Sequence, residues 1–265
     1  VSYVGGVATW DLASVACTPS DGVVTVTVTA TDAIGNTDDG SDDITADNTP
    51  PTAVADFDAA PGHEKCDLSW TMGTDNYVLA GVTVRRDTNA GEYPTYPLFT
   101  AAWPAVDAYY PGDEEAGTEA YDGSGSSAAD AVVDRNIYYY QAFCYDEARN
   151  YGPAATGARD LATNYWLGDV ADGLGSWGYD GLVTFHDMDK LGGTYHQAPP
   201  GSPENEMDVG PTVHPDYNRL GLPTPDNFIG FEDLMIFAMN FGVVSARVVP
   251  FLPEAAEGPL ELALG

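Results

Sequence analysis

The feature that most constrains this chain is an eight-residue pattern that occurs twice without gaps, at 180–187 and at 226–233. Both copies read Asp, then Gly or Asn, an apolar residue, Val or Ile, any residue, Phe, any residue and Asp. An amphipathic stretch follows each copy and stops at Gly192 or Gly242, as a helix does at its C-terminus. The duplication therefore predicts two similar units, each a loop followed by a helix.

Acidic loops of this kind supply the oxygen ligands that a hard cation needs. Calcium takes about six to eight oxygens; in an EF-type loop, position five gives a carboxylate, position seven a carbonyl and position twelve the closing carboxylate. The predicted ligands are Asp169, Asp180, the carbonyl of Leu182 and Asp187 in the first loop, and Asp208, Asp226, the carbonyl of Phe228 and Asp233 in the second. We expect the loops to pair through Val183 and Ile229. The alternative is two Asp-rich turns that cap helices without a metal.

The paired loops resemble dockerin modules, whose calcium loops end in Asp rather than Glu. The resemblance implies a small helical, calcium-binding module over 164–242. The sequence departs from the family pattern, because position one should lie four residues before the Asp-Gly pair. Here Asp169 and Asp208 lie 11 and 18 residues before it, so both loops carry insertions. Recognition of a cohesin partner is therefore not carried over from the family.

Upstream of these loops the sequence is typical of β structure. Residues 23–31 alternate apolar residues with Thr, which predicts a strand with one buried face. An Asp-x-x-x-Asn corner follows at 32–36 and recurs at 146–150, which predicts two related β modules. The first module has too few residues for a sandwich, and half a sandwich is not stable alone. We expect 1–49 to be an incomplete immunoglobulin-like module, whose missing strands were cropped from the chain or come from another chain.

Residues 50–163 begin with Pro-Pro and contain a strand-like segment with one Trp, a second strand and a tyrosine-rich third (50–51, 66–71, 81–86 and 138–140). This segment resembles fibronectin type III and related immunoglobulin-like sandwiches, although an insert at 93–130 departs from the pattern. The expected fold class is mainly β, with such sandwiches followed by a small α-helical, dockerin-like calcium module.

Cysteine positions add an expectation to this resemblance. Cys66 shares a strand face with Trp70, and Cys144 shares one with Tyr138. Immunoglobulin domains join two such strands by a disulfide between the sheets, so the resemblance implies a Cys66–Cys144 bridge. The alternative is two buried free thiols. Cys17 is left over, either as a small buried residue or as an intermolecular link.

The charge balance excludes several classes of partner. Asp and Glu number 41 against nine Lys and Arg, a formal net charge of −32. Nucleic acids and anionic membrane surfaces are therefore not expected partners. No apolar run reaches the ~18 residues of a membrane span, so no membrane insertion is expected. The 44% of hydrophobic residues still allows a packed core.

Catalytic motifs are missing from the sequence. No nucleophile motif, zinc spacing or phosphate loop is present, so we expect no enzyme. The acidic run at 38–43 is interpreted as a solvated loop, with a third calcium site involving Asp32 or Asp47 as the alternative.

The C-terminal tail, 243–265, is extended and apolar and is a candidate donor strand. Together with the incomplete first module it predicts an extracellular structural protein. This protein would be the subunit of a calcium-stabilised filament or surface appendage, assembled head to tail from copies of itself by β-strand complementation. The alternative is a non-catalytic accessory or anchoring segment of a larger secreted enzyme or adhesin.

Overall fold

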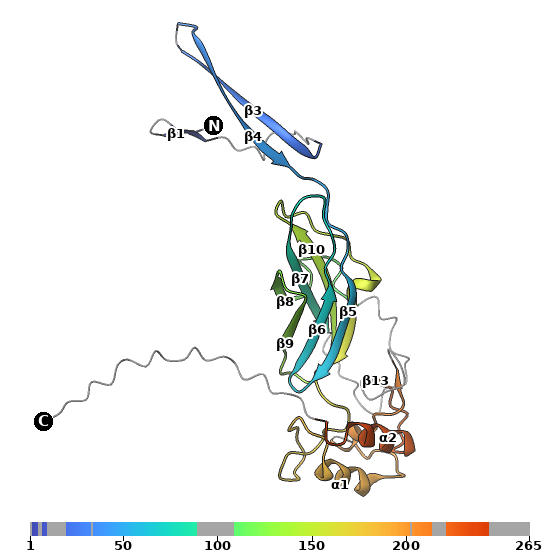
Figure 1. The fold of residues 1–265 in the computed structure, drawn as a ribbon. Helices are drawn as coiled ribbons and strands as arrows, with labels where there is room; N and C mark the ends of the chain where they lie inside the picture. Colours follow the sequence, from blue (N-terminus) through green and yellow to red (C-terminus); the bar gives the residue numbers. More distant parts are fainter. Residues whose placement is uncertain are drawn as a thin grey trace, which may run out of the picture.

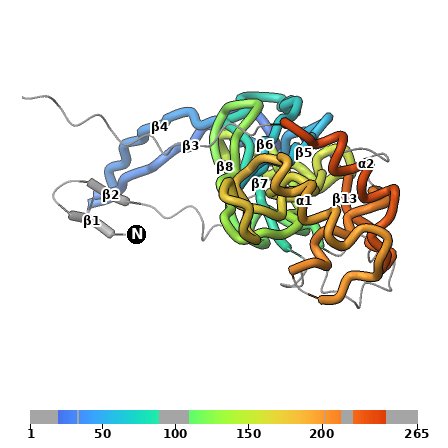
Figure 2. Tube along the Cα trace, turned by 90° about the horizontal axis from the view of Figure 1, so that it is seen from below, coloured from blue at the N-terminus to red at the C-terminus, as the bar shows by residue number. Residues whose placement is uncertain are grey.

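The computed structural model of this protein describes residues 2–4, 7–9, 20–32, 34–88, 109–201, 203–213 and 221–243. Within these residues a long β-hairpin, a β-sandwich and a small module with two helices follow one another along the chain (Figure 1). The hairpin and the helices lie at opposite ends of the sandwich. The hairpin also extends away from the other parts in the perpendicular view of Figure 2. The mainly β fold with a small helical part is confirmed.

Seven antiparallel strands in two sheets form the sandwich. The first sheet has the order β5-β6-β9, with β5 at Ala55–Gly62, β6 at Lys65–Thr71 and β9 at Ser127–Ala131. The second has the order β11-β10-β7-β8, with β7 at Leu79–Thr88, β8 at Thr118–Gly123, β10 at Ile137–Asp146 and β11 at Arg159–Thr163. This is the architecture expected of an immunoglobulin- or fibronectin type III-like sandwich. The part of the insert that the structure describes supplies β8 and most of β9.

Aromatic side chains fill the space between the two sheets. Cys66, Leu68 and Trp70 of β6 are buried while the residues between them are exposed, which is the predicted alternation. The Trp70 ring stacks on Phe57 with 5.8 Å between centroids. β10 is buried on both faces, because its outer side is covered by a second cluster that includes Tyr109 and Leu222.

The expected Cys66–Cys144 disulfide does not form, and both residues are buried free thiols. Cys66 lies beside Tyr140 and directs its thiol to the carbonyl of Thr163 at 3.6 Å. Cys144 comes four residues after Tyr140 on the same strand, roughly 13 Å further along. Its sulfur accepts from the amide of Gly73 at 3.3 Å, beyond the opposite end of β6. Shared inward faces are not enough for a bridge, because the two cysteines lie at different levels of the sandwich.

The N-terminal hairpin consists of β3 (Gly22–Thr31) and β4 (Thr37–Ala46), which pair along their whole length. The acidic run at 38–43, expected as a loop, lies inside β4. This assignment was wrong because β3 offers a backbone partner while the residues of β4 stay exposed along nearly its whole length, so that the carboxylates remain hydrated. Strands β1 (Ser2–Val4) and β2 (Val7–Thr9) form a separate short pair.

The two Asp-x-x-x-Asn corners have the same hydrogen bonds. The carboxylate of Asp32 accepts from the amide of Asn36 at 2.9 Å and from its side-chain nitrogen at 2.7 Å. Asp146 accepts the same pair of bonds from Asn150 at 2.9 and 2.8 Å. The predicted likeness of the corners is confirmed at this level.

Helices α1 (Phe185–Thr194) and α2 (Phe231–Asn240) both begin at the Phe of the repeated pattern. The rest of this module is irregular, with the 3-10 turn η4 (Glu204–Met207) and the short strands β12 (Thr212–Val213) and β13 (Leu222–Pro223). A further turn, η3 (Thr156–Ala158), precedes β11. Gly192 does not end α1, which continues for two residues.

Two separate cores support this arrangement. The sandwich core extends to Ala162, and the core around the helices begins at Tyr165. None of the described helices is long and apolar enough to cross a bilayer. Cys17, residues 93–108 of the insert and residues 244–265 of the predicted donor strand lie outside the described residues.

Candidate metal-binding loops

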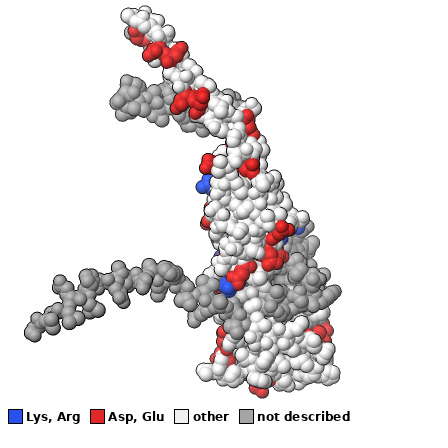
Figure 3. All heavy atoms as spheres, in the orientation of Figure 1, with Lys and Arg blue, Asp and Glu red and all other residues white. Residues whose placement is uncertain are grey.

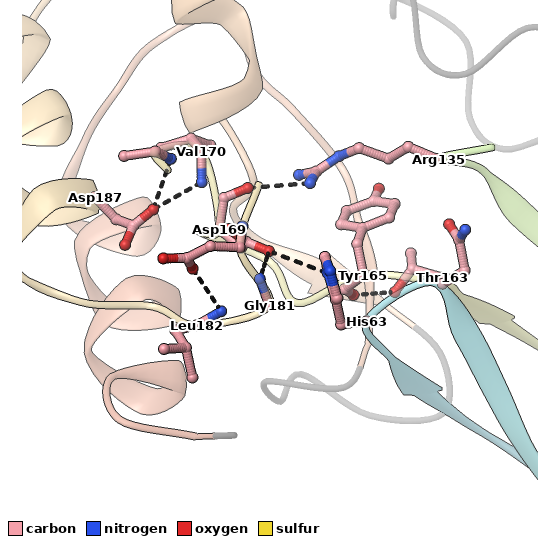
Figure 4. Close-up of polar contacts among 12 residues, drawn as sticks. His63, Arg135, Thr163, Tyr165, Asp169, Val170, Gly181, Leu182 and Asp187 are labelled. Carbon is pink, nitrogen blue, oxygen red and sulfur yellow. Dashed lines mark hydrogen bonds and ion pairs between the residues drawn. The ribbon is translucent and has the colours of Figure 1, made fainter. Parts of the chain in front are cut away.

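The first loop brings the predicted ligand residues Asp169, Leu182 and Asp187 close together (Figure 4), and Asp180 is hydrogen-bonded to Asp169 and Leu182. Asp169 is fully buried, and its two carboxylate oxygens accept from the amides of Asp180 at 3.2 Å and Gly181 at 3.0 Å. The carboxylate of Asp180 in turn accepts from the amide of Leu182 at 3.0 Å. Gly181 has φ +80°, a left-handed conformation that suits glycine. Despite the insertion, Asp169 at position one therefore lies beside Asp180 and Gly181 at positions five and six.

Asp187 closes the first loop from the start of α1. One oxygen accepts from the amides of Val170 and Ala171, both at 2.8 Å, and the other from the amide of Thr184 at 2.7 Å. The Thr184 hydroxyl also donates to it at 3.1 Å. Asp187 is thus the third helical residue of a capping box and also holds the segment after Asp169.

The second loop repeats these contacts. Asp233 is buried and accepts from the amides of Val209 and Gly210 at 2.7 Å and of Gly230 at 2.6 Å. Asp208 accepts from the amide of Asp226 at 3.1 Å, and Asp226 accepts from the amide of Phe228 at 2.9 Å. Asn227, which replaces the glycine of the first loop, has φ +68°. The eight predicted ligand residues therefore lie in two similar arrangements, which differ in that both oxygens of Asp169 accept an amide whereas one oxygen of Asp208 does.

The two units cross over rather than pairing loop to loop. Val183 bridges to Phe241 after α2, where the amide of Gly242 donates to the Val183 carbonyl at 2.9 Å. Ile229 bridges to Gln197 after α1, with its amide donating at 2.9 Å. The expected Val183–Ile229 pairing was wrong. Each loop is held instead by the end of the other unit's helix, so the two units form one module.

Burial changes the acidity of the loop carboxylates. It raises the pKa of Asp169 to about 7 and that of Asp233 to about 6, against the opposing effect of the amide hydrogen bonds. Without a cation, both acids therefore retain protons well above the usual range for aspartate. A bound cation would favour the ionised form and remove this cost.

These donors are chemically suited to calcium, since each loop offers three carboxylates and one carbonyl, all hard oxygen ligands. The same carboxylates already accept from backbone amides and cap the helices, as the metal-free alternative requires. Among the described residues, the loop acids do not bring three ligand atoms within 4.8 Å of one another. Calcium at Asp169, Asp180, Leu182 and Asp187 and at their second-loop counterparts stays a prediction.

Arg135 joins the first loop to the sandwich. It comes from the connection between β9 and β10, and its guanidinium lies 3.8 Å from the ring centroid of Tyr165 and 4.0 Å from that of Tyr179. It donates to the carbonyl of Asp169 at 3.0 Å and lies 3.9 Å from the carboxylate of Glu206. Sequence reasoning missed this residue. The only signal was that cations are scarce, with nine Lys and Arg in the chain.

His63 makes a second contact from the sandwich to the same loop. Its Nδ1 lies 3.9 Å from the carboxylate of Asp169, and its ring packs against the backbone at Gly181, where an added Cβ would come within 2.7 Å of it. The loop is therefore fixed from the sandwich side as well as from α1.

Comparison with known proteins gives distant structural likenesses. No known protein family and no curated protein match the sequence. The FN1–FN3 domains of chicken CNTN1 are similar in structure, with a TM-score of 0.35 and 14% identity, over 55% of this chain and 43% of that one. A beta-1,2-glucanase from Parabacteroides distasonis is similar with a TM-score of 0.29 and 13% identity, over 70% of this chain and 22% of that one. The chain thus spans less than half of either structure.

Proposed function

We propose that this chain is a non-catalytic structural protein of the extracellular space, and that its N-terminal hairpin accepts a β-strand from another copy. Copies joined in this way would build a calcium-stabilised filament or surface appendage. The open hairpin β3–β4 is the observation that carries the proposal. Nucleic acid and membrane are not partners in it.

The hairpin offers both an edge and an apolar face. β3 and β4 pair only with each other among the described strands, so each has a free edge. Val24, Val26 and Val28 follow one another on one face, where Val28 is 38% exposed. A lone hairpin is marginally stable in water. An added strand would satisfy the backbone of an edge and cover the apolar face, which is how β-augmentation binds.

The order of the parts favours an open assembly. The hairpin lies at one end of the sandwich and α2 at the other (Figure 1). The candidate donor strand, 243–265, follows α2 directly. A donor at one end and an acceptor at the other make a heterologous contact, which extends into a filament unless the rotation closes a ring. The structural support for this assembly comes from the acceptor hairpin β3–β4, because residues 244–265 of the candidate donor strand lie outside the described residues.

Calcium has the role of fixing the helical module in this proposal. The two loops place the same carboxylates in the same positions, and a cation in each would offset the burial of Asp169 and Asp233. Addition of a chelator should then lower the melting temperature of the module by many degrees, and calcium should restore it. An unchanged melting temperature would refute structural calcium in the loops and leave the cap interpretation.

Electron microscopy of the full chain tests the assembly. We expect filaments whose number falls sharply in Val28→Asp, which puts a charge on the apolar face. Thr27→Asp is the matched control, because Thr27 is exposed on the other face and is paired with Ser41. Equal assembly of both variants would contradict strand addition at this face.

An anchoring segment is the second candidate function. The helices expose apolar side chains, with Phe185 79% and Phe231 65% exposed, and such surfaces often bind partners. In that case the chain would belong to a larger secreted enzyme or adhesin. Monodisperse monomers at every protein concentration would favour this function over the filament.

A further inference from the structure

Three acidic residues meet at the junction between the hairpin and the sandwich. Asp47 lies in the linker after β4, Asp75 in the connection between β6 and β7, and Asp146 at the end of β10. One carboxylate oxygen from each lies within 4.8 Å of the other two. These are the only described residues in which three such ligand groups come together.

The Asp146 corner holds the linker in this place. Asp146 is fully buried and accepts both hydrogen bonds of the corner from Asn150. The side-chain nitrogen of Asn150 also donates to the carbonyl of Asp47 at 3.0 Å. A residue of the linker is therefore bound to a buried turn of the sandwich, with its side chain among two other acids.

Asp75 has an oxygen that the protein leaves unused. Its Oδ2 accepts from the amide of Tyr77 at 2.9 Å, whereas its Oδ1 is a buried atom that accepts no hydrogen bond from the described residues. None of the ion pairs of the described residues involves these three acids. A buried carboxylate oxygen without a donor, beside two further carboxylates, is costly unless a cation compensates the charge.

We propose that Asp47, Asp75 and Asp146 bind one calcium ion that fixes the hairpin to the sandwich. Carboxylates are the ligands of hard cations, and a cavity of about 200 Å³ beside Asp47, lined also by Glu147 and Tyr77, leaves room for water or a further carboxylate. Calcium accepts such an adaptable shell, whereas magnesium requires a near-ideal octahedron. Ligands from three separate segments make the ion a clamp between the two parts.

A hydrogen-bonded Asp-x-x-x-Asn corner does not by itself create a cation site, as the corner at 32–36 shows. Asp32 has the same hydrogen bonds at the hairpin tip, but no pair of described acids approaches it. The acidic run at 38–43 is not part of the site either. Figure 3 shows acidic groups spread along the hairpin and sandwich. Among the described acids, only Asp47, Asp75 and Asp146 bring three ligand atoms within 4.8 Å of one another.

Calcium titration by calorimetry on the full chain tests the proposal. We expect Asp75→Asn, an isosteric change, to bind one ion fewer than the wild-type chain, or at least about 10-fold more weakly at one site. Asp87→Asn, an exposed acid at the far end of β7, is the matched control and should keep the wild-type stoichiometry. In Asp75→Asn, the number of calcium ions bound per chain should fall from three to two if the helical loops bind calcium. It should fall from one to none if they do not. Failure of the loop sites is therefore distinguishable from failure of this site.

Hydrogen exchange gives a readout at the site itself. Calcium should slow exchange in peptides that cover 45–52 and 74–80 in the wild-type chain and in Asp87→Asn, but not in Asp75→Asn. Asp47→Asn should behave as Asp75→Asn and serves if the latter fails to fold. Equal stoichiometry together with equal affinities in Asp75→Asn and Asp87→Asn would overturn the proposal. So would the absence of calcium-dependent protection of either peptide in the wild-type chain.

Discussion

Replacement of Arg135 by alanine should destabilise the helical module more than any other single change to a basic residue. The guanidinium lies between two tyrosine rings, and its side chain is 14% exposed. A desolvated cation–π contact contributes about 1–2 kcal/mol. A hydrogen bond from a charged group, here to the carbonyl of Asp169, contributes about 1.5–3 kcal/mol. Because these contributions share one side chain and do not add fully, we expect a loss of about 3 kcal/mol.

Arg149→Ala is the matched control for this experiment. Arg149 also lies over a tyrosine ring, 4.5 Å from the centroid of Tyr145, but its side chain is exposed. An exposed cation–π contact is worth only about 0.5–1 kcal/mol. The two variants therefore differ in burial and in the bond to a loop carbonyl, not in the type of residue removed.

Urea unfolding followed by tryptophan fluorescence measures the difference, since Trp166 is buried in the helical module and Trp70 in the sandwich. A loss of about 3 kcal/mol corresponds to a fall in melting temperature of about 12–24 °C for a module of the size of 164–242. Arg135→Lys should recover only part of it, because an ammonium group does not stack between two rings. A shift in Arg135→Ala no larger than in Arg149→Ala would refute the reasoning.

Three further outcomes can be checked by stability measurements. Gly181→Ala should destabilise the protein by more than about 1 kcal/mol, because its φ is +80° and an added Cβ meets the ring of His63. Gly192→Ala, in the last turn of α1 where an added Cβ has open space, should stabilise the protein by about 0.5–1 kcal/mol. Equal urea midpoints of the two variants would contradict this. With a chelator present, the urea midpoint should fall as pH rises from about 4 to 7. The raised pKa of Asp169 makes the folded state bind more protons than the unfolded state in this pH range, so a rise in pH favours unfolding. The Asp169→Asn variant should show a weaker dependence on pH. A reducing agent should leave the melting temperature unchanged, because Cys66 and Cys144 are free thiols. Both should react with a thiol reagent only when the protein unfolds. A lower melting temperature after reduction would indicate a disulfide.

Local patterns predicted local structure well in this chain. The alternation around Trp70 gave the buried face of β6, because a strand has a period of two and one face must leave the water. The duplicated pattern predicted a loop followed by a helix in each copy, although both helices begin earlier than expected, inside the pattern at Phe185 and Phe231, because the acid two residues later caps the helix. These features depend on neighbours within a few residues.

Long-range features were predicted poorly. The Cys66–Cys144 bridge required the two strands to match in level, and sequence alone does not fix how far one sheet slides along the other. The acidic run was placed in a loop because its hydration was considered without the backbone partner that β3 provides. Val183 and Ile229 were paired with each other because the crossing of the two units is a tertiary property.

The sequence by itself determined the kind of chain this is: mainly β, strongly acidic, with one acidic loop–helix unit present twice. These properties follow from composition and short periods, which act through local backbone preferences and the burial of apolar faces. Only the tertiary structure decided which residues distant in the chain meet. It placed Arg135 between two rings at the first loop and brought Asp47, Asp75 and Asp146 together at the junction. Such meetings depend on how the strands and linkers pack, and no spacing along the chain encodes that.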